Sequence, residues 1–362
     1  MTQSFDEYIR QGEPSQKEKA QIWQTAIGLQ DIDGLRVSDY LIETAKENIE
    51  GKITIDEVQY RIESYYKQQK ISQHIGNNRT EEADTVSSRI SKILSNDTFS
   101  FSPVEYIAIH RQLFTGIYKF AGKIRNYNIS KNEWILNGKS VLYANATEIR
   151  ATLDYDFNQE KQYNYQITDF TQSIQHLVQF ISDIWQIHAF GEGNTRTTAV
   201  FAIKYLRSFG FKIDNESFAK HSWYFRNALV RANYNDWTNN IHATQEFLMK
   251  FFGNLLLGEN NELKNRYMRV DWAENVPVNS QKGGVNGGVN SQNGGVNGGV
   301  NLLQKIIIEL MRQNPQISVV EIANQTGKPR RTIENNVKKL KELNAITRIG
   351  SDKTGEWKIV KK

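Results

Sequence analysis

Apolar residues recur every three or four positions along much of the first 260 residues, the spacing that places them on one face of an α-helix. Residues 103–118 and 169–190 show this pattern most clearly. Residues 36–70 show it in two pieces, and we expect a helix on each side of Gly51. A later helical stretch is expected to end at Gly210, because glycine commonly terminates helices. The pattern predicts a body that is mainly α-helical.

One segment of the body departs from this spacing. Residues 124–144 alternate between apolar and polar positions and are rich in Ile, Tyr and Trp. They also contain Asn137-Gly138, and Asn-Gly between alternating residues is a strong signal for a tight hairpin turn. We therefore expect a β-hairpin that interrupts the helical body.

A glycine-rich repeat divides the body from the tail of the chain. Residues 283–290 read GGVNGGVN, and residues 294–301 repeat them. Glycine at this density favours a flexible tether, because it loses much backbone entropy on ordering and buries little surface. A β-solenoid is the alternative, although four short units bury very little.

The tail, residues 302–362, predicts three helices followed by two short strands, the order of a winged helix-turn-helix. Its third helix begins near Arg330 and takes the place of the recognition helix. The side chains expected to reach DNA lie in its first turns: Arg330, Arg331, Thr332 and Asn335. A winged-helix module that binds protein is the alternative for this tail.

Charge separates the two parts in the same way. The chain has a net charge of +5, whereas residues 302–362 carry 13 Lys and Arg against 6 Asp and Glu, a net of +7, which leaves −2 for the rest. Positive charge confined to the tail favours nucleic-acid contact there. The absence of cysteine excludes disulfides and thiolate metal sites. The polar first residues lack a signal-peptide pattern, and no apolar run approaches the roughly 20 residues of a membrane helix. A cytoplasmic protein that avoids membranes is expected.

Residues 187–199, IHAFGEGNTRTTA, carry the candidate chemistry. They form a glycine-containing loop between two predicted helices, and the N–H groups at the start of the second helix attract phosphate. His188 is suited to accept a proton near neutral pH. Glu192 offers an oxygen ligand for Mg²⁺, and Arg196 a fork for a phosphate. Each residue alone has an ordinary structural explanation, but together they suit phosphoryl-group transfer.

This segment resembles the signature of the Fic (Fic/Doc) family, His-x-Phe-x-(Asp/Glu)-Gly-Asn-Gly-Arg-x-x-Arg. The matching residues are His188, Phe190, Glu192, Gly193, Asn194 and Arg196. The resemblance extends over residues 80–257, and the Asn137-Gly138 hairpin falls where the family has its flap.

The resemblance implies a helical bundle with a β-hairpin flap that binds a target segment in extended form. It also implies transfer of AMP from ATP to a Ser, Thr or Tyr hydroxyl of a target protein. His188 would be the general base, and Glu192 would hold Mg²⁺. The nucleotide phosphates would be cradled by four consecutive residues: Gly193, Asn194, Thr195 and Arg196.

Two residues depart from the signature. Thr195 replaces its second glycine, and Ala199 replaces its second arginine, which in the family grips the terminal phosphate. The loss of a charged hydrogen bond costs roughly 1.5–3 kcal/mol. Another nucleotide, a shorter diphosphate-linked donor or a reaction that removes AMP therefore stays open. The competing hypothesis is a DNA-binding regulator whose Fic body senses a nucleotide with little catalysis.

An inhibitory helix is also expected near the N-terminus. Many Fic proteins carry (Ser/Thr)-x-x-x-Glu-(Gly/Asn), and Lys46 to Gly51 matches it at Glu50-Gly51. Residues 38–66 resemble the small antitoxin domain that other Fic proteins receive from a partner chain. Glu50 would then restrain the site by reaching Arg196. The alternative is that Glu50 is a solvated residue at a helix end.

The predicted organisation has four parts. Residues 1–79 form the antitoxin-like inhibitory region, residues 80–275 the Fic domain, residues 276–301 the linker and residues 302–362 the winged helix-turn-helix. The expected partners are a target protein, Mg²⁺ with ATP as donor, and DNA. The sequence leaves the oligomeric state open, a homo-oligomer included.

Overall fold

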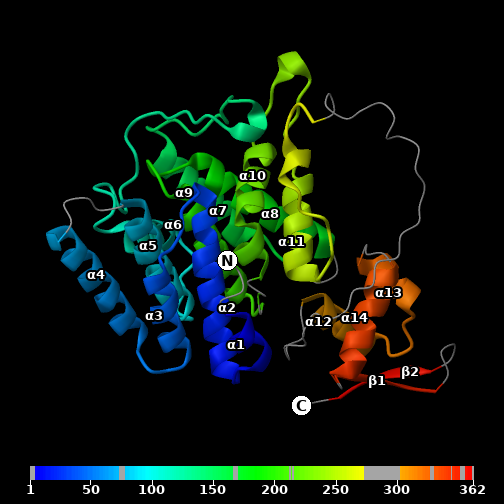
Figure 1. The fold of residues 1–362 in the computed structure, drawn as a ribbon. Coiled ribbons are helices and arrows are strands. Elements are labelled where there is room, and N and C mark those ends of the chain that lie inside the picture. Colours follow the sequence, from blue (N-terminus) through cyan, green and yellow to red (C-terminus); the bar gives the residue numbers. More distant parts are fainter. Residues whose placement is uncertain are drawn as a thin grey trace.

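Helices build nearly all of the regular structure, as the apolar spacing predicts (Figure 1). The computed structural model describes residues 5–72, 78–165, 170–211, 213, 216–272, 302–326, 330–343, 345–350 and 355–360. Within them the α-helices are α1 (Asp6–Gln11), α2 (Pro14–Gly28), α3 (Asp39–Ile49), α4 (Ile55–Ser72), α5 (Asn78–Leu94), α6 (Pro103–Phe114), α7 (Ile149–Gln162), α8 (Phe170–Ile187), α9 (Asn194–Ser208), α10 (Glu216–Ala232), α11 (Glu246–Leu257), α12 (Leu302–Gln313), α13 (Val319–Thr326) and α14 (Arg330–Glu342). The 3-10 helices are η1 (Leu29–Asp33), η2 (Trp134–Leu136), η3 (Trp237–Asn239) and η4 (Asn265–Met268). No described helix is long and apolar enough to cross a membrane.

The predicted break between two N-terminal helices is confirmed. Helix α3 ends at Ile49, Gly51 adopts a positive φ of 77°, and α4 begins at Ile55. A left-handed residue directly after a helix favours glycine, because glycine has no Cβ to clash there. Helices α1 to α4 pack around an apolar cluster of their own: Phe5, Ala20, Trp23, Leu41, Ala45, Ile49, Val58, Ile62 and Tyr66.

Helix α2 belongs to both parts of the body. Its Trp23 packs in the N-terminal cluster, while Ile22 and Ala26 on its other side pack in the main core. It contacts α5 and α10, and Gly28 lies so close to α10 that an added Cβ would meet the carbonyl oxygen of Ala219 at 2.2 Å. The N-terminal helices are therefore anchored to the body through the second half of α2.

Helix α9 lies at the centre of the main core. Every side chain from Asn194 to Leu206 is buried, and α6 and α8 pack directly against the helix. Burial on all sides fixes its position rigidly, so the loop at its N-terminus is also held in place. This loop carries the candidate chemistry. The helix ends at Ser208, and Gly210 has a positive φ of 79°, as the sequence predicts.

The predicted hairpin is wrong in its secondary structure. Asn137 and Gly138 do form a left-handed turn, with φ values of 54° and 84°, but residues 127–144 contain no strand. The segment before the turn closes into the 3-10 helix η2 instead. Its backbone also bonds elsewhere, because Val270 N–H donates to the carbonyl of Ile135 at 2.9 Å. We call residues 127–144 the cover segment, since they lie beside the loop that precedes α9.

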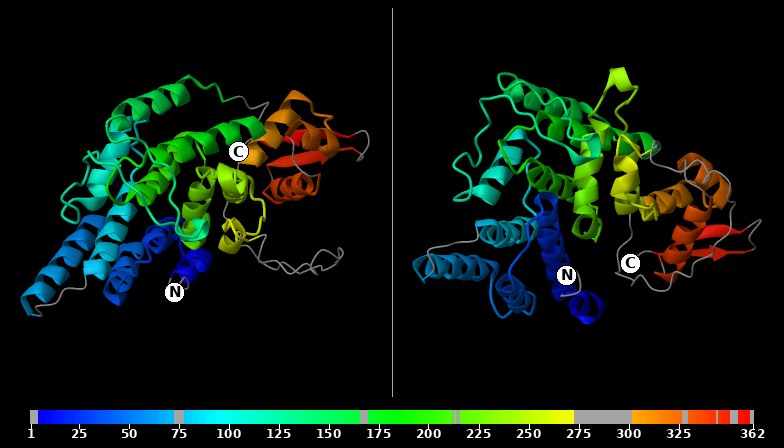
Figure 2. Two further views of the ribbon diagram at one scale, coloured as in Figure 1. Left: turned by 90° about the horizontal axis from the view of Figure 1, so that it is seen from above. Right: turned by 45° about the horizontal axis from the view of Figure 1, so that its top comes forward.

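The tail has the predicted winged-helix order, α12, α13 and α14 followed by strands β1 (Ile346–Ile349) and β2 (Glu356–Ile359). The strands pair antiparallel, with Ile346 opposite Ile359. This domain lies to one side of the body, and its α12 contacts α11 (Figure 2). The predicted linker, residues 276–301, lies outside the described residues.

Candidate functional site and winged-domain groove

His188 occupies the first position after α8, in an unusual backbone conformation. Its φ is 50°, a left-handed value that is uncommon for a residue with a side chain. The residue is only 3% exposed, yet neither Nδ1 nor Nε2 has a hydrogen-bond partner among the described residues. Tyr143 from the cover segment covers it at 4.2 Å between ring centroids, and Trp185 meets it edge-on at 5.5 Å. A buried polar ring without partners is costly in a fold and marks a candidate functional group.

Arg125 holds this conformation from the opposite side. Its Nε donates to the carbonyl of His188 at 2.8 Å, and its backbone N–H donates to the carbonyl of Ala189 at 2.9 Å. The rest of its guanidinium donates to the carbonyls of Tyr127, Ala144 and Ile187. One buried arginine therefore ties the cover segment to the end of α8 and fixes where the His188 ring lies.

The surroundings keep His188 neutral. Burial lowers the pKa of His188 well below its ordinary value of 6.5, and the positive charges of Lys131 and Arg125 lower it further. A neutral imidazole has one ring nitrogen free to accept a proton. The ring is therefore in the unprotonated form that a base needs, while the lowered pKa weakens it as a proton acceptor.

Glu192 lies on the loop between α8 and α9, and its side chain is 54% exposed. Its carboxylate pairs with Lys131 of the cover segment at 2.9 Å. Its backbone carbonyl is fixed by His110 of α6, because Gly122 N–H donates to Nδ1 of His110 and leaves the Nε2 proton for that carbonyl, at 3.0 Å. Burial lowers the pKa of His110 to about 4, so this ring stays neutral and structural.

The side chains of the loop before α9 are largely used to build it. The Asn194 amide accepts from the N–H of Phe190 at 2.9 Å and donates to its carbonyl at 2.8 Å. Thr195 Oγ1 accepts from the Trp185 indole at 2.9 Å. Gly193 is the left-handed residue before the helix, with φ of 81°, and a Cβ there would lie 2.4 Å from the Phe114 ring. The first N–H groups of α9 have no intrahelical acceptor.

Arg196 points into the body. Its side chain is 1% exposed, and its guanidinium pairs with Asp33 of η1 at 2.7 Å and with Glu82 of α5 at 2.6 Å. Gln30 and Tyr118 provide further oxygens at 3.1 and 3.2 Å. The Arg196 guanidinium, which was predicted to bind a phosphate, therefore binds two carboxylates of the same chain instead.

Glu50 does not approach Arg196. It lies just beyond the end of α3, where its carboxylate accepts from Tyr8 Oη at 2.5 Å and pairs with Lys52. The expected contact between Glu50 and Arg196 is thus absent, and Asp33 of η1 occupies that position. The inhibitory role of Glu50 stays a prediction, but the contact with Arg196 that was expected to produce it is not present.

Sequence reasoning missed five residues that shape the site: Asp33, Glu82, His110, Arg125 and Lys131. Asp33 had a usable signal, because Asp33-Gly34 repeats the acid-glycine pattern of Glu50-Gly51 in an N-terminal helical turn. The other four are far from the motif in sequence, and only the packing of α5, α6 and the cover segment brings them to it.

The winged domain contains a second candidate site. Three of the four predicted DNA contacts, Arg330, Arg331 and Asn335, are exposed, while Thr332 is half-buried. Arg331 and Asn335 share one face of α14, because they are four residues apart. Arg330 lies on a different face and pairs with Glu334 at 2.8 Å.

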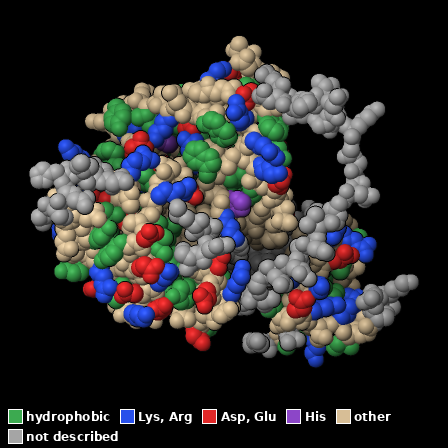
Figure 3. Space-filling view, in the orientation of Figure 1, with side chains coloured by type: hydrophobic (Ala, Val, Ile, Leu, Met, Phe, Trp, Pro, Cys, Tyr) green, Lys and Arg blue, Asp and Glu red, His purple; other side chains and the backbone are tan. Residues whose placement is uncertain are grey.

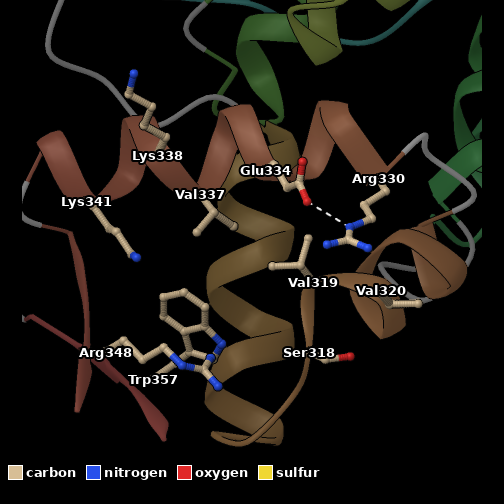
Figure 4. Close-up of a pocket in the computed structure, with 10 residues that line it drawn as sticks. All are labelled: Ser318, Val319, Val320, Arg330, Glu334, Val337, Lys338, Lys341, Arg348 and Trp357. Atoms are coloured by element: carbon tan, nitrogen blue, oxygen red, sulfur yellow. Dashed lines mark hydrogen bonds and ion pairs between the residues drawn. The ribbon is translucent and has the colours of Figure 1, made fainter. Parts of the chain in front are cut away.

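The face of α14 that carries Arg330 and Glu334 borders a groove with a cavity volume of about 470 Å³. Its walls are Ser318, Val319, Val320, Arg330, Glu334, Val337, Lys338, Lys341, Arg348 and Trp357 (Figure 4). The lining includes four cationic residues and one carboxylate, and Arg348 lies over the Trp357 ring at 4.6 Å. The space-filling view shows Lys, Arg, Asp and Glu side chains on the drawn face of this domain (Figure 3). The groove itself has a net positive lining.

Comparisons with known proteins identify both regions. Residues 100–206 match the model of the Fic/DOC family, and residues 301–347 match the model described as winged helix-turn-helix DNA-binding. The chain is also similar to a solved structure described as a Fic family protein from Desulfovibrio desulfuricans G20. That similarity has 14% identity and a TM-score of 0.45, over 97% of this chain and 89% of the other. No curated protein matches the chain.

Proposed function

We propose that this chain, in which a Fic/DOC domain is joined to a winged helix-turn-helix, transfers AMP or a related phosphate-linked group from a nucleotide to a protein hydroxyl. The observation that carries the proposal is His188, a buried and neutral imidazole whose two nitrogens have no hydrogen-bond partner in the part of the chain that the structure describes. It lies next to a helix start that can bind phosphate. A base beside an anion site is what this transfer requires.

With ATP as donor, the first N–H groups of α9 hold the phosphates, and His188 accepts the proton of the target hydroxyl. The hydroxyl oxygen bonds to the α-phosphorus as the bond from that phosphorus to its bridging oxygen breaks. Pyrophosphate leaves with the electron pair of the broken bond. The protein contributes positioning and charge, which dominate catalysis of phosphoryl transfer.

Glu192 is the residue that would hold Mg²⁺. Among the described residues no three His, Cys, Asp or Glu side chains form a metal cluster, so the ion would need substrate oxygens as well. Mg²⁺ commonly binds one or two carboxylates together with substrate phosphates, and the exposed Glu192 carboxylate fits that use. Bound there, the ion would neutralise charge on the phosphates.

The cover segment is the proposed contact for the target. Three of its large apolar side chains, Tyr127, Trp134 and Leu142, are 52%, 47% and 84% exposed. Exposed apolar side chains in one segment favour a protein partner. The Tyr143 ring lies over His188, so a target hydroxyl reaches the base only when this part of the cover segment shifts.

We assign the restraint on the site to Asp33 and Glu82 in place of Glu50. Both carboxylates bind the arginine of the motif, which is then unable to bind phosphate. Arg196 must release Asp33 and Glu82 before its guanidinium can contact a nucleotide. The N-terminal region keeps its proposed inhibitory function, but through η1 and α5.

A regulator that senses a nucleotide without transfer is the second candidate. The engagement of Arg196 by two carboxylates favours it, because the ground state has no motif arginine free for phosphate. In either case we propose that the winged domain contacts DNA and that its basic groove beside α14 binds the DNA phosphate backbone.

Intact-mass spectrometry tests the proposal. The full chain is incubated with Mg²⁺ and each of a panel of nucleotides, alone and with a cell extract depleted of nucleotides. We expect one nucleotidyl group added to the chain or to a target, lost in His188→Ala and retained in His242→Ala, an exposed histidine outside the site. Binding of a nucleotide without any mass gain would favour the sensor, and an unchanged gain in His188→Ala would refute the assigned base.

A further inference from the structure

The start of α9 offers no accessible cation to a phosphate. Arg196 is buried against Asp33 and Glu82, and Ala199, one turn later, is apolar and fully buried. A nucleotide with two or three phosphates carries several negative charges, which backbone N–H groups alone neutralise only in part. A cation from outside the helix would complete the site.

Three cations act electrostatically on His188: Lys131, Arg125 and Arg226. Arg125 is 4% exposed and donates to four backbone carbonyls, so it is committed to the fold. Arg226 pairs at 2.6 Å with Glu133, which is 1% exposed. A pair with a buried carboxylate is costly to break, because the partner is left charged and desolvated.

Lys131 differs from both. Its side chain is 28% exposed, and among the described residues its ion-pair partner is Glu192, which is 54% exposed. Ion pairs between solvent-exposed groups contribute little to stability, so this one can exchange partners at small cost. The backbone N–H of Lys131 donates to Ser140 Oγ at 3.1 Å, which holds the residue within the cover segment. The amine therefore lies beside the loop that precedes α9, next to the carboxylate assigned to the metal.

We propose that Lys131 is the phosphate-binding cation of this site and exchanges Glu192 for a nucleotide phosphate when the metal-bound nucleotide arrives. The inference rests on the proposed function. Glu192 would hold the divalent ion, and the Lys131 amine, released from that carboxylate, would bind an oxygen of the incoming polyphosphate. A lysine suits this exchange, because its ammonium is a compact charge on a flexible stem with three donors.

The exchange also specifies the ligand class. Lys131 recognises a nucleoside di- or triphosphate that carries its own divalent ion, since a ligand without the ion would leave Glu192 to compete for the amine. Without nucleotide, Lys131 and Glu192 neutralise each other.

Titration calorimetry of the full chain with ATP and Mg²⁺ tests this role in four proteins. They are the parent, Lys131→Met, Lys131→Arg and the control Lys92→Met. Lys92 forms a comparable exposed pair with Asp56 at 2.6 Å, on helices α5 and α4, away from the loop. We expect the Kd to rise about tenfold in Lys131→Met, the loss of one charged hydrogen bond. Lys131→Arg should stay within about threefold of the parent, since the charge is kept, and Lys92→Met should bind like the parent.

A purely structural role predicts another pattern. In that case Lys131→Met would lower the thermal midpoint, and Lys131→Arg would fail to restore binding. Lys131→Met with the parent's Kd would overturn the proposal, and so would an equal loss in Lys92→Met. If the parent itself binds no nucleotide and adds no mass to a target, the proposed function fails together with the role of Lys131. If the parent binds and Lys131→Met is unaffected, only the role of Lys131 fails.

Discussion

The pair between Asp33 and Arg196 makes a direct prediction about activity. Asp33→Asn keeps the size of the side chain and one hydrogen-bond acceptor but removes its negative charge. Arg196 then keeps Glu82 as its sole carboxylate partner. We expect the arginine to leave its buried position more readily and nucleotide transfer to rise.

The magnitude follows from the exposure of the two partners. A hydrogen bond to a charged group contributes about 1.5–3 kcal/mol. The Asp33 carboxylate is 38% exposed, so solvent screens part of the interaction. A net loss of about 1–2 kcal/mol corresponds to a rise of roughly 5- to 30-fold in the population with Arg196 released. Glu82 is only 17% exposed, so Glu82→Gln should act at least as strongly.

The assay is the rate of nucleotidyl addition measured by intact mass, with Glu50→Gln as the matched control. Glu50 also carries a carboxylate at an N-terminal helix end, but it pairs with Tyr8 and Lys52. We expect Glu50→Gln to react at the parent's rate. Activation by Glu50→Gln without activation by Asp33→Asn would refute the assignment of the restraint. Thermal unfolding of each variant excludes a loss of folded protein as the cause.

Two further predictions concern stability and DNA. Burial lowers the pKa of His110 to about 4, so the unfolded chain binds its proton near pH 6.5 and the folded chain does not. This part of the stability is present above about pH 6.5 and is lost as the pH falls toward 4, by about 3 kcal/mol, and denaturant unfolding should find a smaller acid loss in His110→Asn. For the winged domain, we expect the double variant Lys341→Met with Arg348→Met to reduce the salt slope of duplex DNA binding by about 1–2, measured by fluorescence anisotropy. Lys339→Met, an exposed change outside the groove, should reduce the salt slope less. Equal salt slopes in all variants would show that the groove does not bind the DNA phosphate backbone.

Local periodicity predicted the helices correctly, but the hairpin that it predicted is wrong. The alternation in the cover segment is real, since Val141 and Tyr143 are buried while Leu142 is 84% exposed. A strand also needs a partner for its backbone, and Val270 takes the carbonyl of Ile135 instead. The Asn137-Gly138 turn forms as its sequence requires. The side-chain pattern thus fixed which residues face inward, whereas tertiary contacts decided the hydrogen bonding.

The restraint illustrates a limit of a different kind. Glu50-Gly51 and Asp33-Gly34 present the same local pattern, an acid followed by a left-handed glycine with φ of 77° and 64°. Nothing within either segment states which acid meets the arginine of the motif. That choice depends on how α2 packs against α5 and α10, which brings η1 to Arg196 across 163 residues of sequence. The motif itself was predictable because its parts are adjacent in the chain.

The charges around the loop imply an order of events when a nucleotide binds. Lys131 and Arg196 are the two cationic side chains proposed to bind phosphate, and carboxylates of the chain neutralise both. Lys131 pairs with Glu192, and Arg196 pairs with Asp33 and Glu82. The pairs differ in burial, since Lys131 and Glu192 are 28% and 54% exposed while Arg196 is 1% exposed. An exposed pair exchanges at little cost, whereas a buried arginine must first be released by its partners. We therefore expect Lys131 to respond to the nucleotide first, and the N-terminal carboxylates to determine whether Arg196 follows.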